Sequence, residues 1–219
     1  MHDAVTCTLT QQRGRWHDEE REVPRMTLYF REAVATGHRL AVMLHGRGSD
    51  EEDLLPLAFV FGADTRVISV RAPFSMHPGY AWFVSDAGQI DESVAALNAL
   101  IDQQADAGSV ILLGFSQGGL MACATAVHRR ARNIQAVVSL SAPPLTSHAT
   151  DKPLRDVPVF WGHGRQDPVV PFDRGQTMRK TLEQLGAHVH ARDYAMGHTI
   201  SPKELEAIAQ WLTHIDAGG

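Results

Sequence analysis

Short apolar runs alternate with amphipathic stretches along most of the chain. The runs 39–44 and 109–113 are almost wholly apolar, which is typical of strands that are buried on both faces of a sheet. The stretch 90–104 repeats its apolar residues at helical spacing and predicts an amphipathic helix. Repeated strand and helix units of this kind predict an α/β fold, with a mostly parallel central sheet and helices on both faces.

The other segments extend this pattern. An Ala-rich helix is expected at 119–127, and the final helix from 202 has Ser201 as its cap, Pro202 at its first position and Glu204 closing a capping box. A loop with several Pro and Gly residues covers 71–84. No linker or repeat is visible, so one domain over 1–219 is expected, with 1–25 a polar N-terminal extension. The remaining expected strands are 26–32, 67–70, 134–140, 157–161 and 189–194, and the remaining expected helices are 54–59 and 177–185.

Composition narrows the class of protein. The chain has 219 residues and a net charge of −5, which gives no basic surface for nucleic acid. No apolar segment reaches membrane-spanning length, and the first residues lack the pattern of a signal peptide, so we expect a cytoplasmic protein without stable membrane insertion. Only Cys7 and Cys123 are present, and none of the 12 histidines has a recognisable metal-site spacing. We therefore expect neither a disulfide framework nor a metal, and no cofactor is implied.

The stretch Gly114-Phe115-Ser116-Gln117-Gly118 lies between the apolar run 109–113 and the helix expected at 119–127. Strand, tight turn and helix form the setting of a nucleophile elbow, in which a strained turn exposes a serine hydroxyl at the top of a sheet. Glycines fit on either side because a side chain would collide with the crowded turn. The pattern alone also fits an inert Gly/Ser loop, but its flanks favour Ser116 as a nucleophile.

A serine nucleophile needs a histidine base, which follows the acid in the chain order of this kind of fold. The base should lie in a loop at the carboxyl end of a strand. His188 and His190 fall within a strand, and His214 lies near the end of the last helix. His198 lies in the short loop between the strand ending near 194 and the last helix, so we expect it to be the general base.

The same two constraints select the acid. Asp167 lies just beyond the expected strand 157–161, where it can orient the histidine, although an Asp-Pro turn would also explain it. Asp173 has the place of a helix N-cap. The candidates that the position or the secondary structure disfavours are Asp151, Asp156, Asp173 and Asp193.

An oxyanion hole would complete such a site. One donor is expected to be the backbone N–H of Gln117, directly after the nucleophile. The other should come from the loop after an early strand, which is the segment 44–48, and we choose the backbone N–H of Arg47. Trp82, Phe83 and Met76 are candidates for an apolar substrate pocket, and they fit equally well as hydrophobic anchors of their loop.

Together these motifs resemble the phospholipase/carboxylesterase family of small α/β-hydrolases, which includes the acyl-protein thioesterases. The resemblance covers about 39–212 and implies an α/β-hydrolase fold without a large lid domain, with Ser116, Asp167 and His198 as triad and Arg47 and Gln117 as oxyanion donors. The motifs that carry it are Leu44-His45-Gly46-x-Gly48, Gly114-Phe115-Ser116-Gln117-Gly118-Gly119, Asp167-Pro168-Val169-Val170-Pro171 and Gly197-His198.

The expected function is therefore a serine carboxylesterase acting on short- to medium-chain carboxylic esters. An acyl-thioesterase or a lysophospholipase of the same family is the alternative, and an inactive hydrolase-like binding module is a remote one. The family commonly has an apolar residue where this chain has Arg47. An arginine there suggests the hypothesis that substrates with an anionic group are favoured, unless the side chain simply faces solvent. The oligomeric state is left open.

Overall fold

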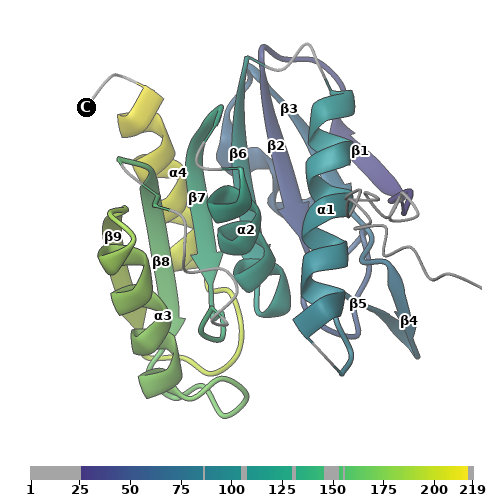
Figure 1. Cartoon of the computed structure of the whole chain (residues 1–219). Coiled ribbons are helices and arrows are strands. Elements are labelled where there is room, and N and C mark those ends of the chain that lie inside the picture. Colours follow the sequence, from purple (N-terminus) through teal and green to yellow (C-terminus); the bar gives the residue numbers. More distant parts are fainter. Residues whose placement is uncertain are drawn as a thin grey trace, which may run out of the picture.

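A seven-stranded sheet runs through the protein in the order β1-β3-β2-β6-β7-β8-β9 (Figure 1). The structure is a computed structural model that describes residues 26–85, 87–104, 108–129, 132–145, 153–154 and 156–216. The N-terminal extension 1–25 with Cys7, and Asp151, lie outside these residues. Within this seven-stranded sheet only the pair β1–β3 is antiparallel, and the other neighbouring pairs are parallel. The predicted, mostly parallel α/β sheet is confirmed.

The strands in the middle of the sheet come from the apolar runs of the sequence. Their residues are almost all buried because helices cover both faces, whereas no residue of the edge strand β9 is fully buried. Strand β8 continues three residues beyond its expected end, since its pairing with β9 extends as far as Gly164 and Tyr194. The strands of this sheet are β1 (Phe30–Val34), β2 (Arg39–Leu44), β3 (Thr65–Val70), β6 (Ser109–Phe115), β7 (Ile134–Leu140), β8 (Pro158–Gly164) and β9 (His188–Tyr194).

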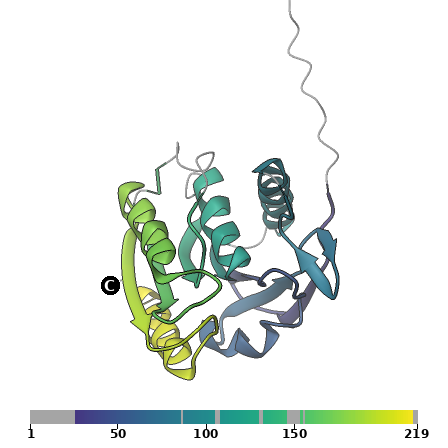
Figure 2. The ribbon, with the colours of Figure 1, turned by 90° about the horizontal axis from the view of Figure 1, so that it is seen from below.

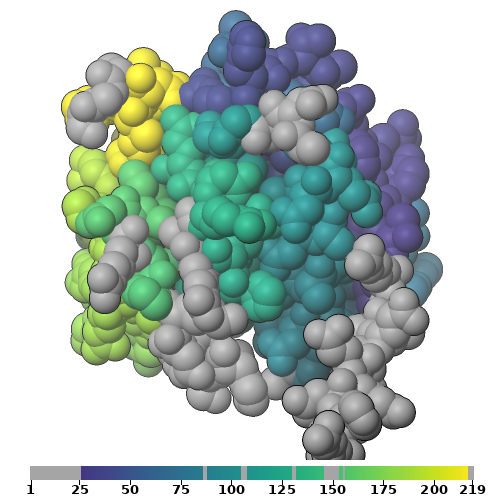
Figure 3. Space-filling model, turned by 45° about the horizontal axis from the view of Figure 1, so that its top comes forward, coloured from purple at the N-terminus to yellow at the C-terminus, as the bar shows by residue number. Residues whose placement is uncertain are grey.

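Helices lie on both sides of the sheet and bury two separate apolar clusters against it. Helices α1 (Ala87–Gln103), α2 (Gln117–His128) and α3 (Phe172–Gln184) pack on one face, where α1 and α2 form a continuous surface (Figure 3). Helix α4 (Pro202–Asp216) and the 3-10 helix η1 (Leu55–Phe61) cover the other face, as the view along the strands shows (Figure 2). The described residues contain no lid domain, and none of their helices is long and apolar enough to cross a membrane.

Three local expectations need correction. The segment expected as a helix at 54–59 is a 3-10 helix, which Gly62 ends with φ 75°. Helix α3 begins at Phe172 instead of near 177 because Pro171, with φ −51°, already occupies the N-cap, so Asp173 lies in the first turn and is not the cap. The loop 71–84 contains a hairpin of two short strands, β4 (Phe74–Met76) and β5 (Gly79–Ala81).

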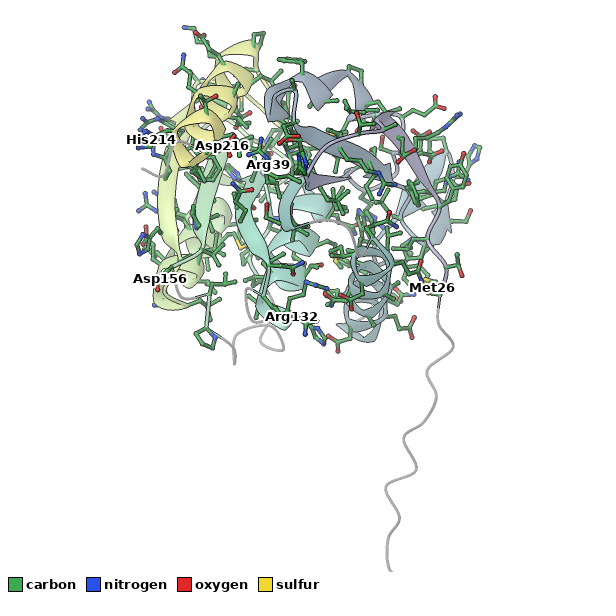
Figure 4. All side chains as sticks on the ribbon, turned by 90° about the horizontal axis from the view of Figure 1, so that it is seen from above. Met26, Arg39, Arg132, Asp156, His214 and Asp216 are labelled. Carbon is green, nitrogen blue, oxygen red and sulfur yellow. The ribbon has the colours of Figure 1, made fainter. Side chains whose placement is uncertain are left out.

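The two ends of the parallel strands differ in the residues that lie there. At the amino-terminal ends of the strands, Arg39 and Asp216 form an ion pair, and Arg132 and Asp156 lie at the same end (Figure 4). The loops that follow β2, β6, β8 and β9 all lie at the opposite end, at the carboxyl ends of the strands, because these strands are parallel. Those loops hold the predicted site residues.

Candidate active site

A sharp turn at Ser116 joins strand β6 to helix α2. The residue has φ 55° and ψ −120°, a left-handed backbone conformation that residues other than glycine seldom adopt. Its peptide N–H donates to the carbonyl oxygen of Leu140 in β7 at 2.8 Å, so the chain turns only after this sheet hydrogen bond is made. The turn leaves Ser116 partly exposed at the carboxyl edge of the sheet, which is the arrangement of a nucleophile elbow.

The glycines on either side of Ser116 are required by close backbone contacts. A Cβ at Gly114 would lie 2.0 Å from the carbonyl oxygen of Gly118, and a Cβ at Gly118 would lie 1.9 Å from that of Leu44. These atoms are backbone, so they cannot give way as the end of a flexible side chain would. The Gly-x-Ser-x-Gly spacing therefore follows from the packing of the elbow against the end of β2.

The structure brings the three residues predicted as a triad into one hydrogen-bonded chain. His198 Nε2 lies 3.0 Å from Ser116 Oγ, and His198 Nδ1 lies 2.7 Å from Asp167 Oδ2. The ring of Phe115 packs against the imidazole, with 4.7 Å between ring centroids. With Nδ1–H donating to the carboxylate, Nε2 is left as the acceptor for the serine hydroxyl. This is the geometry that general-base activation of a serine needs.

The other candidate histidines lie elsewhere. His188 pairs with Asp156 at 3.3 Å, where both side chains are exposed. His190 packs on the rings of Phe160 and Trp211 on the outer part of the sheet. Neither makes a hydrogen bond to the serine, so the choice of His198 by its loop position agrees with the geometry.

Asp167 is held as an anion by directed hydrogen bonds. Its side chain is fully buried, and Oδ1 accepts the peptide N–H groups of Val169 and Val170, each at 2.8 Å. Burial acts to raise the pKa of Asp167, but the hydrogen bonds from His198 and from these two N–H groups outweigh it, so the pKa is lowered. The carboxylate therefore stays charged and keeps one oxygen for the histidine.

His163 supports this loop from beneath, a contact that the sequence did not reveal. Its side chain is fully buried, Nε2 donates to the carbonyl oxygen of Val170 at 2.9 Å, and Nε2 lies 3.7 Å from Asp167 Oδ2. The ring stacks on Trp161 with an interplanar angle of 14°. Gly175 leaves room for it, since a Cβ there would lie 2.4 Å from the imidazole. Its position between two glycines at the end of an apolar strand was the one available signal.

On the other side of the serine, His45 orients the loop that follows β2. Its Nδ1–H donates to the carbonyl oxygen of Gly46 at 2.7 Å, and its Nε2 accepts the N–H of Ala72 at 3.0 Å. Burial lowers the pKa of His45, so the ring stays neutral and can do both. In a trans peptide the C=O and N–H point in opposite directions. Drawing the Gly46 carbonyl toward His45 therefore turns the N–H of Arg47 away from it.

Gln117 and Trp82 tie this loop to the elbow. The Gln117 side chain accepts the N–H of Trp82 at 3.1 Å and donates to the carbonyl oxygen of Phe83 at 2.8 Å, while Trp82 Nε1 donates to the carbonyl oxygen of His45 at 2.9 Å. Trp82 is completely buried, so in this conformation its ring offers no surface to a substrate. Phe83 and Met76 are partly exposed and stay predicted pocket residues.

Two free N–H groups lie beside the serine. Within the described residues, no acceptor takes the peptide N–H of Arg47 or of Gln117. The loop is close to the elbow, since a Cβ at Gly46 would lie 3.5 Å from the Cβ of Ser116. Gln117 is also the first residue of α2, where the helix favours negative charge. The arrangement can stabilise an oxyanion that forms next to the serine.

Other chemistry has little support in the described residues. None of their His, Cys, Asp and Glu side chains form a group of three or more that could hold a metal ion. Burial raises the pKa of the Cys123 thiol to about 12, so this cysteine in α2 is not a nucleophile near neutral pH.

Comparison with known proteins gives one consistent result. A model of the phospholipase/carboxylesterase family matches residues 34–215. A probable carboxylesterase of Oryza sativa subsp. japonica is 28% identical over 210 residues, covering 82% of this chain and 89% of that protein. An acyl-protein thioesterase 1 of Kluyveromyces lactis is 32% identical over 143 residues, covering 58% of this chain and 61% of that protein. The crystal structure of esterase PE8 is similar with a TM-score of 0.75 and 29% identity, over 86% of this chain and 99% of that one.

Proposed function

The chain belongs to the phospholipase/carboxylesterase family, and from this premise we propose that it is a serine carboxylesterase for short- to medium-chain esters. The observation that carries the proposal is the continuous contact from Asp167 through His198 to Ser116, at 2.7 Å and 3.0 Å. Hydrogen-bonded nucleophile, base and orienting acid are the parts that acyl transfer to a serine requires.

In this proposal Ser116 is the nucleophile and His198 the general base. His198 takes the hydroxyl proton through Nε2 as the serine oxygen attacks the ester carbonyl carbon. Asp167 holds Nδ1–H, which fixes the tautomer and stabilises the imidazolium. His198 then returns its proton to the leaving alkoxide, which gives an acyl-enzyme on Ser116. A water activated by the same histidine releases the acid and regenerates the serine.

The tetrahedral intermediates place a negative charge on the former carbonyl oxygen. We assign its stabilisation to the peptide N–H groups of Arg47 and Gln117. Two observations support this assignment: neither N–H has an acceptor among the described residues, and Gly46 lies close to the elbow. Such donors typically contribute about 10²–10³ in kcat each. Both belong to the backbone, so they act through the loop geometry that His45 and the Gln117 side chain hold.

A fluorophosphonate probe and a panel of p-nitrophenyl esters test the proposal. The wild-type protein should hydrolyse the esters and become labelled at Ser116, as mass spectrometry of the labelled peptide would show. Ser116→Ala should lose the label and about 10⁶-fold in kcat, since triad residues act as a unit. A folded wild-type protein that neither takes the label nor cleaves any ester would instead be the inactive binding module.

Thioesters are the second candidate class of substrate. The proteins similar to this chain include ones named acyl-protein thioesterase 1, and the same acyl-enzyme chemistry serves both bonds. Parallel assays with acyl thioesters and oxygen esters of equal chain length, and with a lysophospholipid, would distinguish the three activities by kcat/KM. A cytoplasmic location is also part of the proposal.

A further inference from the structure

The side chain of Arg47 lies on the rim of the proposed oxyanion site, where only its backbone has been given a role. It is exposed, and its Nε donates to Met76 Sδ at 3.2 Å. Met76 belongs to the β4–β5 hairpin, which is bound to the same loop by the hydrogen bonds from Gly48 N–H to Tyr80 O at 2.7 Å and from Tyr80 N–H to Ser49 O at 2.8 Å. The loop and the hairpin are thus held together, and the Arg47 guanidinium lies against Met76 of the hairpin.

No described carboxylate is within ion-pair distance of Arg47, although four acidic residues follow at 50–53. Glu51 accepts two hydrogen bonds from Arg71, at 2.6 Å and 2.5 Å. Glu52 pairs with Arg31 at 2.9 Å. Glu51 and Glu52 therefore have their own arginines, and neither Asp50 nor Asp53 lies within ion-pair distance of Arg47. In the described part of the chain the charge of Arg47 has no counterion.

Arg71 shows what a structural arginine in this region looks like. Besides its two bonds to Glu51, its guanidinium lies 4.5 Å from the ring centre of Tyr29 and 4.6 Å from that of Tyr80. A guanidinium has five N–H donors. In Arg47 one of them meets a thioether sulfur, which is a weak acceptor, and the others have no acceptor among the described residues.

We propose that the Arg47 side chain recognises a carboxylate on the substrate, so that the enzyme prefers anionic esters. This inference rests on the proposed function, in which the ester carbonyl oxygen lies at the N–H of the same residue. The substrate carboxylate must then lie no farther from that oxygen than the length of an extended arginine side chain, about 6 Å. Monoesters of short dicarboxylic acids satisfy this on the acyl side, and acyl esters of small hydroxy acids satisfy it on the alcohol side. A planar guanidinium suits a carboxylate because it can bind both oxygens.

Two pairs of esters test the preference, with hydrolysis followed as proton release at constant pH. Monomethyl glutarate is compared with methyl hexanoate for the acyl side, and acetoxyacetate with propyl acetate for the alcohol side. The readout is the ratio of kcat/KM between the anionic and the neutral ester of a pair, so any general loss of activity cancels. Arg47→Met, Arg47→Lys and the control Arg132→Met are measured beside wild type. Arg132 is an exposed arginine at the opposite edge of the sheet (Figure 4).

In Arg47→Met the ratio should fall about 10- to 100-fold for at least one pair, the range of a hydrogen-bonded charge. Arg47→Lys should retain part of the ratio because the charge remains without the fork. Added salt should lower the wild-type ratio, and Arg132→Met should leave it unchanged. A ratio within twofold of wild type in Arg47→Met for both pairs would overturn the inference while ester hydrolysis persists. If wild type cleaves none of the four esters and Ser116 takes no fluorophosphonate, the proposed function itself has failed.

Discussion

The two sides of Ser116 are built in different ways. The acid–base side consists of Asp167, His198 and the loops 165–171 and 195–201 that carry them. Asp167 is buried there, and the fully buried His163 supports its loop. The oxyanion side consists of the loop 45–49 and the β4–β5 hairpin. Its inner part, His45 and Trp82, is equally buried, but its rim is the exposed Arg47.

This difference separates chemistry from specificity. On the acid–base side Asp167 accepts three hydrogen bonds, so both of its carboxylate oxygens are engaged within the protein. On the oxyanion side the two peptide N–H groups have no acceptor among the described residues, and the only partner that the Arg47 guanidinium has there is the weak acceptor Met76 Sδ. Substitutions on the first side should therefore affect all esters alike, and substitutions on the rim of the second should discriminate among them.

The largest effect should come from removing the base. His198→Ala leaves Ser116 without a proton acceptor, so kcat should fall about 10⁶-fold for every ester, by the precedent of other triads. Steady-state kinetics with neutral and anionic esters would measure it. His188→Ala removes an exposed histidine on the neighbouring strand and should keep wild-type rates. A loss confined to one ester class would contradict the assignment of His198 to the chemical step.

Asp167→Asn should lower kcat by about 10⁴, since an amide can no longer hold His198 in the required tautomer. The fold should survive, because one amide oxygen can still accept the N–H groups of Val169 and Val170. Circular dichroism would check the fold, and kcat the effect. Asp193→Asn is the matched control, as Asp193 pairs with Arg165 and not with a histidine. Equal losses in the two variants would remove the case for Asp167 as the orienting acid.

On the oxyanion side, Gln117→Ala should lower kcat about 10²-fold while leaving the acid–base chain complete. The N–H donor of residue 117 remains, but the side-chain bonds to Trp82 and Phe83 are lost, and a displacement of about 1 Å costs this much. The buried N–H left at Trp82 should also lower the free energy of unfolding by about 1–3 kcal/mol. Urea unfolding and kinetics would measure both, with the exposed Gln210→Ala as control. Unchanged kcat with lost stability would show that the side chain serves only the fold.

The smallest effect on catalysis is expected beneath the acid–base side, where a buried carboxyl group affects stability instead. Glu204 in α4 is buried under β8, where a Cβ at Gly162 would lie 2.1 Å from its carboxylate. Burial raises the pKa of Glu204 to about 8, and neither carboxylate oxygen has a hydrogen-bond partner among the described residues. The folded state thus holds a proton that the unfolded state releases near its ordinary pKa of 4.5, so stability falls as pH rises from there through about 8.

Glu204→Gln should remove this loss. The difference in free energy of unfolding between this variant and wild type should shift in favour of the variant by on the order of 4 kcal/mol from pH 5 to pH 9, measured by urea unfolding at both values. Glu206→Gln, on the exposed side of the same helix, should show no such difference. A parallel pH dependence in all three proteins would mean that Glu204 ionises normally in the folded state.

Local sequence signals predict some parts of this site and not others. Chain order and position after a strand predict Asp167 and His198, because parallel strands place their carboxyl ends at the same end of the sheet, whatever the conformation of the loops. Ser201 was recognised as a cap and does accept the N–H of Glu204 at 3.2 Å, but the depth at which the Glu204 side chain is buried depends on β8. The start of α3 was missed because no apolar periodicity precedes residue 177.

The sequence by itself determined the strand and helix alternation, the elbow with its two glycines and the order of the candidate triad. These depend on local backbone preference and on topology, both of which are written in contiguous residues. Only the tertiary structure decided that His163 lies under Asp167, that the Gln117 side chain binds the backbone 34 and 35 residues away, and that Arg47 has no described counterion. Hydrogen bonds and ion pairs of this kind join segments far apart in the chain, so they depend on how the folded elements pack.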